Sequence, residues 1–186
     1  KAGMDLTKVE GTVGMSEKTV IEFYLDYLAK EKGYKFKKVA IPAIPDRFAA
    51  LMAGELDSSL MPDPFPTIAK GKGSKAVWDS NEEGTPKIGA VIWKKDFIDA
   101  NKGAVERFVK TTNEVIEEIN KNGRDSYKDV AIESNLISPD HFDAVAPKSY
   151  DKIVPATEDN FKLVNEWCKE KGMISENLEY NSYMIK

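Results

Sequence analysis

Short β-like runs alternate with amphipathic helical patterns through the first half of this 186-residue chain. Glycine follows the first two helical patterns, as it often does at helix ends. The strand and helix pairs are 10–15 with 16–33, 38–41 with 45–54 and 56–61 with 63–71, and further strand-like runs follow at 75–79 and 87–93. Because strands that alternate with helices form right-handed βαβ units, the pattern predicts an α/β fold with a mostly parallel sheet flanked by helices.

The pattern changes after Trp93, where helices dominate and no further strand is predicted. The longest helix is expected at 101–123, shorter ones at 124–134 and 138–145, and a last one at 157–172. The first and last of these have apolar faces that need a covering layer, yet the sequence offers no second sheet. We therefore expect exposed apolar surface that leads to self-association, exchange of elements or repacking.

Composition excludes several classes of protein. Charged residues make up 31% of the chain, both signs are interspersed and the formal net charge is −4, so no nucleic-acid surface is expected. No apolar stretch approaches the roughly 18 residues that cross a bilayer. The N-terminal residues have neither the apolar core of a signal peptide nor an initiator Met, so we expect that any targeting segment was removed or lay outside this chain.

Residues typical of catalysis are scarce. His141 is the only histidine and Cys168 the only cysteine, and no nucleophile is readable beside a base. His141 lies among helix-start residues, which favours a surface or packing role, and the position of Cys168 beside Trp167 favours a structural thiol. Neither a metal-ligand cluster nor a glycine-rich phosphate loop occurs. We expect no enzyme activity, no metal and no cofactor.

Loops follow the first three predicted strands, and in an open parallel sheet such loops meet where ligands bind. In the first loop, Ser16 is expected either to cap the next helix or to contact a ligand, together with Glu17 and Thr19 in the first turn. In the second loop, Arg47 is either an ordinary surface charge or a ligand contact.

The third loop contains Asp63, Pro64 and Phe65. Asp63 suits a helix N-cap with proline at the first helical position, where the missing N–H costs nothing. The same carboxylate stands where it would accept a hydrogen bond from a ligand, and Phe65 stands where it would stack on a ring.

Five segments in this order carry a resemblance to a known family. They are SEKTV (16–20), IPAIPDRFAALMAGELD (41–57), LMPDPFPTIA (60–69), KDFIDANKGAVERFVKTTNEVIEEIN (95–120) and NFKLVNEWCKEKGMI (160–174). In this arrangement the chain resembles the substrate-binding proteins of bacterial ABC importers in the nitrate/sulfonate/taurine group. The resemblance implies a type II periplasmic-binding-protein fold, with two α/β lobes that close on a small solute.

The resemblance also implies an assignment of segments and contacts. Residues 8–86 correspond to the second lobe, and residues 87–186 to a return strand and the C-terminal helices of the first lobe, whose N-terminal strands are expected upstream of Lys1. The family's ligand contacts map onto Ser16, Glu17, Thr19, Met61, Asp63 and Phe65. Many relatives have glutamate before the proline where this chain has Asp63, which changes the reach of the carboxylate.

The resemblance implies an extracytoplasmic solute-binding component, periplasmic or lipid-anchored, that delivers its small-molecule solute to an ABC permease and catalyses no reaction. Two alternatives remain open: an enzyme of the same fold in thiamine-pyrimidine or menaquinone precursor synthesis, and the ligand-sensing domain of a regulator. The solute class also remains open. Helix N-termini suit nitrate, a sulfonate or a phosphonate, whereas Glu17 and Asp63 favour a nitrogen-bearing organic solute such as a pyrimidine precursor.

Overall fold

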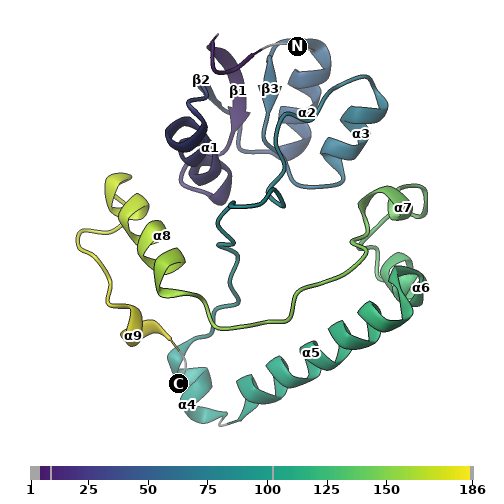
Figure 1. The fold of residues 1–186 in the computed structure, drawn as a ribbon, viewed down its shortest axis with the longest axis vertical. Coiled ribbons are helices and arrows are strands. Elements are labelled where there is room, and N and C mark those ends of the chain that lie inside the picture. The colour runs from purple at the N-terminus through teal and green to yellow at the C-terminus, as the bar shows by residue number, and fades with distance from the viewer. Residues whose placement is uncertain (1–4, 9, 102, 185–186) are drawn as a thin grey trace. The chain divides into compact units, whose positions relative to one another are not determined.

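The computed structural model describes residues 5–8, 10–101 and 103–184, and the chain divides into two compact units. The first unit holds the described residues up to Pro86 together with Glu158–Tyr183. The second unit holds Lys87–Thr157 and Met184. Each unit has its own hydrophobic core. Figure 1 shows the helices and strands of both units.

Three parallel strands form the sheet of the first unit, in the order β2–β1–β3 (Figure 1). They are β1 (Gly11–Met15), β2 (Phe36–Ala40) and β3 (Ser58–Ser59). Helix α1 (Val20–Lys32) leads from β1 to β2, helix α2 (Ile44–Ala53) leads from β2 past β1 to β3, and α3 (Phe65–Gly71) follows β3. Because crossovers are right-handed and these two run in opposite directions across the sheet, α1 and α2 cover opposite faces.

Residues of β1 alternate between these faces, as the pleat of a strand requires. Val13 and Met15 are buried and form a hydrophobic core with Leu25 of α1. Gly14 faces the other way, where a Cβ atom would lie 2.6 Å from Cδ1 of Leu56 and 3.5 Å from Cδ of Arg47. Glycine at this position therefore lets the α2 side pack directly on the backbone of the central strand.

Two more helices belong to the first unit, although they lie far along the chain. They are α8 (Glu158–Glu170) and α9 (Tyr180–Tyr183). The indole of Trp167 packs edge-on against Phe23 of α1, with ring centroids 5.6 Å apart. Asn165 fixes the connection to α9, because its amide group both donates to and accepts from the backbone of Leu178.

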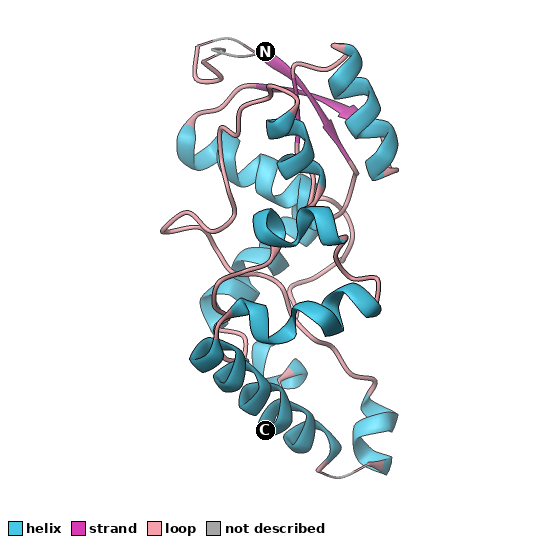
Figure 2. Cartoon of the chain, turned by 90° about the vertical axis from the view of Figure 1, so that its right-hand side faces the viewer, coloured by secondary structure: helices cyan, strands magenta, loops and turns pink. Residues whose placement is uncertain are grey.

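The regular structure of the second unit is helical in its described residues, and all the strand in the described part of the chain, magenta in Figure 2, lies in the first unit. Its elements are α4 (Lys95–Ala100), α5 (Ala104–Asn122), a 3₁₀ turn (Arg124–Tyr127), α6 (Lys128–Glu133), a second 3₁₀ turn (Pro139–His141) and α7 (Phe142–Val145). Phe142 is fully buried and packs with Ala131, Ala146 and Tyr127. No helix in the described ranges is long and apolar enough to cross a membrane.

Two asparagines of α5 hold the returning chain along the helix. Asn113 and Asn120 each accept a backbone N–H and donate to a backbone carbonyl, at Ile153 and Tyr150 respectively. Because the two asparagines are seven residues apart, they lie two turns apart on one helical face. Their side chains satisfy backbone groups that would otherwise need a neighbouring strand.

The structure corrects the predicted strands in three places. The runs at 75–79 and 87–93 form no strand, and the third strand is limited to Ser58–Ser59 instead of 56–61. A strand exists through hydrogen bonds to a neighbour, and the described residues place no ladder partner beside either run. The return strand expected at the start of 87–186 is therefore wrong, whereas the α/β fold and the parallel sheet flanked by helices are confirmed.

Several apolar side chains of the second unit are exposed, and one of them, Val115, lies on the long helix for which an uncovered face is predicted. Ile92, Val115, Val130, Leu136 and Val154 have exposed fractions between 52% and 89%. Self-association through such residues stays a prediction.

The close contact at Gly14 predicts a specific packing effect. Gly14→Ala should lower the free energy of unfolding by about 1–3 kcal/mol, because the added methyl group overlaps Leu56 in a filled interior. Leu56→Ala should also destabilise the protein, through the cavity it leaves. The double variant should lose less than the sum of the two, as measured by urea denaturation; additive losses would mean that the two residues do not compete for space.

Candidate functional site

The parallel sheet brings the three predicted loops to one edge. Met15 pairs with Ala40 across β1 and β2, and Gly14 pairs with Ser59 across β1 and β3. All three strands point the same way, so the loops that leave their carboxyl ends begin side by side. The direction of connection also reverses at β1, which in open α/β sheets marks the place where ligands bind.

The first loop contains Ser16, Glu17 and Thr19, and its outer side chains are exposed or half-exposed. Thr19, and not Ser16, caps α1, because its hydroxyl oxygen accepts a hydrogen bond from the amide of Ile21 at 3.2 Å. The prediction of Ser16 as the cap is wrong because Lys18 is left-handed (φ 54°), which delays the helix to Val20. The hydroxyl of Thr19 donates to the Ser16 carbonyl at 2.8 Å and so fixes the turn.

The second loop covers a buried arginine. Arg47 of α2 is only 1% exposed, and its Nη1 donates to the carbonyl oxygens of Ile41 (2.7 Å) and Pro42 (3.1 Å). Its Nε is buried without a hydrogen-bond partner, and no carboxylate of the described residues forms a salt bridge with it. Burial lowers the pKa of this guanidinium below its ordinary value. A positive charge therefore lies directly beneath the loop at the carboxyl end of β2.

The sequence did not predict the burial of Arg47, which was expected to be either a surface charge or a ligand contact. Helical spacing contained the signal, because Arg47 lies three residues after Ile44 and four before Leu51, on the same face of α2. That face packs on the sheet beside Gly14, so the arginine is buried with it.

The third loop holds Met61, Asp63 and Phe65. Met61 is buried, and the Phe65 ring packs on Phe48 of α2 with centroids 5.5 Å apart. The expected N-cap role of Asp63 is wrong, because α3 begins after Pro64 and has no side-chain cap. Asp63 instead accepts a hydrogen bond from the hydroxyl of Thr67 at 3.0 Å, which leaves its carboxylate at the exposed side of the rim.

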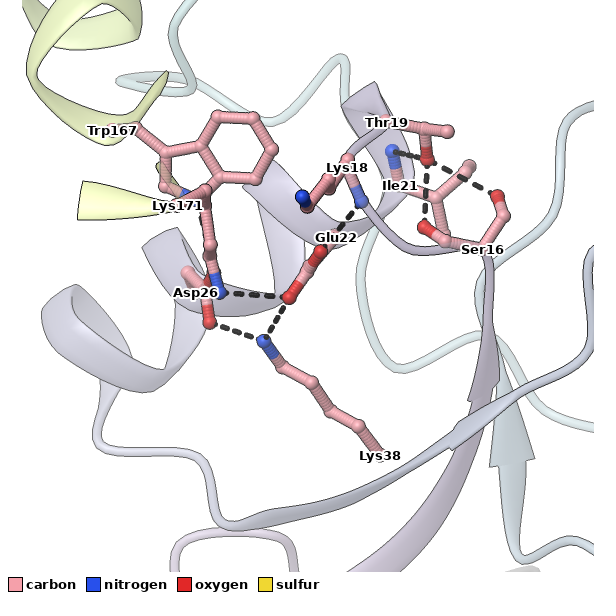
Figure 3. A network of polar contacts seen from close by, with 9 residues as sticks. All are labelled: Ser16, Lys18, Thr19, Ile21, Glu22, Asp26, Lys38, Trp167 and Lys171. Atoms are coloured by element: carbon pink, nitrogen blue, oxygen red, sulfur yellow. Dashed lines mark hydrogen bonds and ion pairs between the residues drawn. The ribbon is translucent and has the colours of Figure 1, made fainter. Parts of the chain in front are cut away.

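An ion network lies behind the first loop and joins α1, β2 and the end of α8 (Figure 3). Glu22 accepts from Lys171 at 2.7 Å and from Lys38 at 3.2 Å. Asp26 contacts the same two lysines at 2.8 and 2.5 Å, and it accepts from the indole N–H of Trp167 at 2.9 Å. Each carboxylate is thus held by several donors.

This network decides the charge state of its members. Burial alone would raise the pKa of Glu22, but hydrogen bonds from Lys171, the Lys18 amide and Lys38 outweigh burial and leave the pKa below its ordinary value. The pKa of Asp26 is lowered in the same balance, against burial, by Lys171, Lys38 and Trp167. Burial opposes the charge of Lys171, but Asp26 and Glu22 raise its pKa. All three are therefore charged at neutral pH.

Neither the histidine nor the cysteine of the chain lies on the three rim loops. His141 belongs to the second unit and Cys168 to the first. Burial raises the pKa of the Cys168 thiol, which disfavours the reactive thiolate. In the described ranges, no group of three or more metal-ligating side chains occurs. The rim can hold a solute through hydroxyls, helix N-terminal amides and charge, and these groups suit binding.

Solved structures with the same fold are periplasmic binding proteins. The periplasmic aliphatic sulphonate binding protein SsuA of Escherichia coli is 13% identical over 97% of this chain, with a TM-score of 0.73. The periplasmic sulfonate-binding protein SsuA of Methylobacillus flagellatus KT is 13% identical over 94%, with a TM-score of 0.68. The chain has a periplasmic-binding-protein fold.

These comparisons confirm the predicted likeness at the level of the fold. This chain spans 61% of the Escherichia coli protein and 56% of the Methylobacillus flagellatus protein. No protein-family model and no curated protein matches the sequence. The six predicted contact residues lie on two loops of one sheet edge, and their contact with a solute stays a prediction.

The ion network predicts a pH dependence of stability. The contribution of Glu22 is complete above its ordinary pKa of 4.5 and is lost as the pH falls through the lower value of the folded protein. Glu22→Gln should therefore destabilise by about 1–3 kcal/mol at neutral pH, where it removes charge-assisted hydrogen bonds. By pH 3, urea denaturation should find a smaller difference between the two proteins.

The matched control is Glu31→Gln, an exposed carboxylate on the same helix. It should change stability by less than about 0.5 kcal/mol at either pH. A Glu22→Gln difference that persists unchanged in acid would contradict the charged network.

Proposed function

We propose that this chain is part of the solute-binding component of an ABC importer and captures a small organic sulfonate outside the cytoplasmic membrane. Its partners are then the solute and an ABC permease. The observation that carries the proposal is the single sheet edge where three loops meet above the buried, uncompensated charge of Arg47. Two proteins of the same fold are sulfonate-binding proteins, which supports the same solute class here.

Charge at the rim favours an anionic end of the solute. The N-termini of α1 and α2 carry partial positive charge and direct free amides toward the edge. α2 has no side-chain cap, so its first amides are not occupied by a capping oxygen. Arg47 adds a full charge beneath the same loop, and a bound anion would supply the opposite charge that the folded protein lacks there.

Exposed acids at the rim favour a second, positive group on the solute. Glu17 is exposed on the first loop, and Asp63 keeps its carboxylate on the third. These acids would repel a pure anion but attract an ammonium group. An aminoalkane sulfonate such as taurine satisfies both sets of charges. The nitrogen-bearing solute expected from the sequence and the sulfonate expected from the fold then describe one molecule.

The enzyme alternative lacks the residues that it needs. A precursor-synthesising enzyme of this fold would require dedicated histidine, cysteine or metal-ligating groups at the rim, and the described rim residues offer hydroxyls, two exposed carboxylates and a buried guanidinium. Binding without turnover accounts for these groups with no further requirement. We therefore propose that this chain is not an enzyme.

Isothermal titration of the 186-residue chain with taurine, ethanesulfonate and ethanolamine tests the proposal. Both sulfonates should bind, taurine more tightly, and ethanolamine should not. Asp63→Asn should weaken taurine about two- to fivefold, as expected for an exposed ion pair, and should not weaken ethanesulfonate, which the carboxylate repels. Asp159→Asn on α8 serves as the matched control. Failure of every sulfonate to bind would refute the proposed solute class.

Arg47 has its own prediction. Arg47→Met should weaken ethanesulfonate about tenfold, since the buried charge is removed. It should affect the neutral analogue ethanesulfonamide much less. Arg47→Lys, which keeps the charge, should restore part of the preference. An unchanged ratio of the two affinities in Arg47→Met, in a variant whose urea midpoint confirms folding, would assign Arg47 to loop structure alone.

A further inference from the structure

The first rim loop contains a backbone conformation that needs support. Lys18 has φ 54°, a left-handed conformation that is unfavourable for a residue with a Cβ atom. The turn it makes brings the hydroxyls of Ser16 and Thr19 to 3.1 Å from each other and determines where both lie. Something must therefore stabilise Lys18 if the rim is to keep its shape.

Glu22 supplies that support from the first turns of α1. Its Oε2 accepts a hydrogen bond from the backbone N–H of Lys18 at 2.7 Å. Glu22 is only 7% exposed, so this bond is shielded from competition with water. Figure 3 shows the carboxylate between the Lys18 amide and the two lysine ammonium groups.

The other oxygen of the same carboxylate is held by distant parts of the chain. Oε1 accepts from Lys171, which follows α8, and from Lys38 of β2. Lys171 also contacts Asp26, and its ammonium lies 5.8 Å from the centroid of the Trp167 ring. Trp167 in turn donates to Asp26, so α8 is fastened to α1 by the residues that orient Glu22.

We propose that Glu22 is a positioning residue through which the docking of α8 sets the shape of the solute-binding loop. When α8 is docked, Lys171 fixes the carboxylate of Glu22, and the carboxylate fixes the Lys18 turn with Ser16 and Thr19. When α8 leaves, one of the two cations on Oε1 is lost and the turn relaxes. Through this link α8 regulates affinity at a rim that it does not itself form. The effect on affinity rests on the proposed function, whereas the effect on the loop does not.

Backbone amide exchange of the ligand-free chain, followed by NMR, tests the coupling directly. Lys171→Met should speed exchange of the Lys18 amide by about tenfold, in line with a weakened charge-assisted hydrogen bond, and leave the Val13 amide in β1 nearly unchanged. Lys169→Met, at an exposed lysine in the last turn of α8, is the control and should change neither. Equal acceleration at Lys18 and Val13 would indicate general destabilisation and overturn the proposal, as would an unchanged Lys18.

Two substitutions of Glu22 separate its hydrogen bond with the Lys18 amide from its ion pairs with the lysines. Glu22→Gln keeps an oxygen for the Lys18 amide but loses the charge that attracts Lys171, whereas Glu22→Ala loses both. Protection of the Lys18 amide should therefore fall further in Glu22→Ala than in Glu22→Gln. Equal losses in both variants would contradict direct positioning by the carboxylate.

Titration with taurine then connects the loop to the solute. Lys171→Met should weaken taurine about three- to tenfold and Lys169→Met should not. If the wild-type chain binds no sulfonate, the proposed function is wrong. The exchange experiment then still shows whether the docking of α8 controls the Lys18 turn. If the wild type binds and Lys171→Met binds equally well despite a loosened loop, regulation of affinity by α8 is refuted.

Discussion

Parallel pairing of β1 with both β2 and β3 is the constraint on which the first unit depends. Because β1 is central, its two faces meet different helices, and Gly14 admits the α2 side to the backbone while Val13 and Met15 meet α1. The same pairing places three loops at one edge. The site is thus a consequence of strand order, and the loops need no long insertions to reach one another.

Contacts between residues far apart in the sequence also stabilise the first unit. Residues 158–183 belong to this unit although residues 87–157 of the second unit precede them in sequence. Trp167 and Lys171 hold this segment to α1, through contacts with Phe23, Glu22 and Asp26. Apolar packing and an ion network act together at this contact. Charged groups tolerate burial there because each has several partners, which offsets their desolvation.

Much of this architecture could be predicted from the sequence. Periodicity and helix-ending glycines located α1, α2, α5 and α8, and the strand–helix alternation gave the parallel sheet. The runs at 75–79 and 87–93 were mistaken for strands because a pattern of apolar residues carries no information on whether a partner strand is present. The predicted N-cap residues of α1 and α3 were wrong for local reasons. The left-handed Lys18 moves the start of α1 beyond Ser16, and Asp63 accepts a hydrogen bond from the Thr67 side chain instead of capping α3. The network around Glu22 joins residues about 150 positions apart, which no local pattern reveals.

Glu22 and Arg47, the two most buried charged side chains among the described residues of the first unit, differ in whether the protein compensates their charge. Glu22 has two cations and an amide on its carboxylate, as a structural charge requires. Arg47 has two carbonyl oxygens, an unpartnered Nε and no carboxylate, although an apolar residue would fill the same helix face at lower cost in desolvation. Stability alone explains the first arrangement and does not explain the second. A cation kept buried beneath a loop of the proposed binding rim is explained if, as proposed, its opposite charge arrives with a solute.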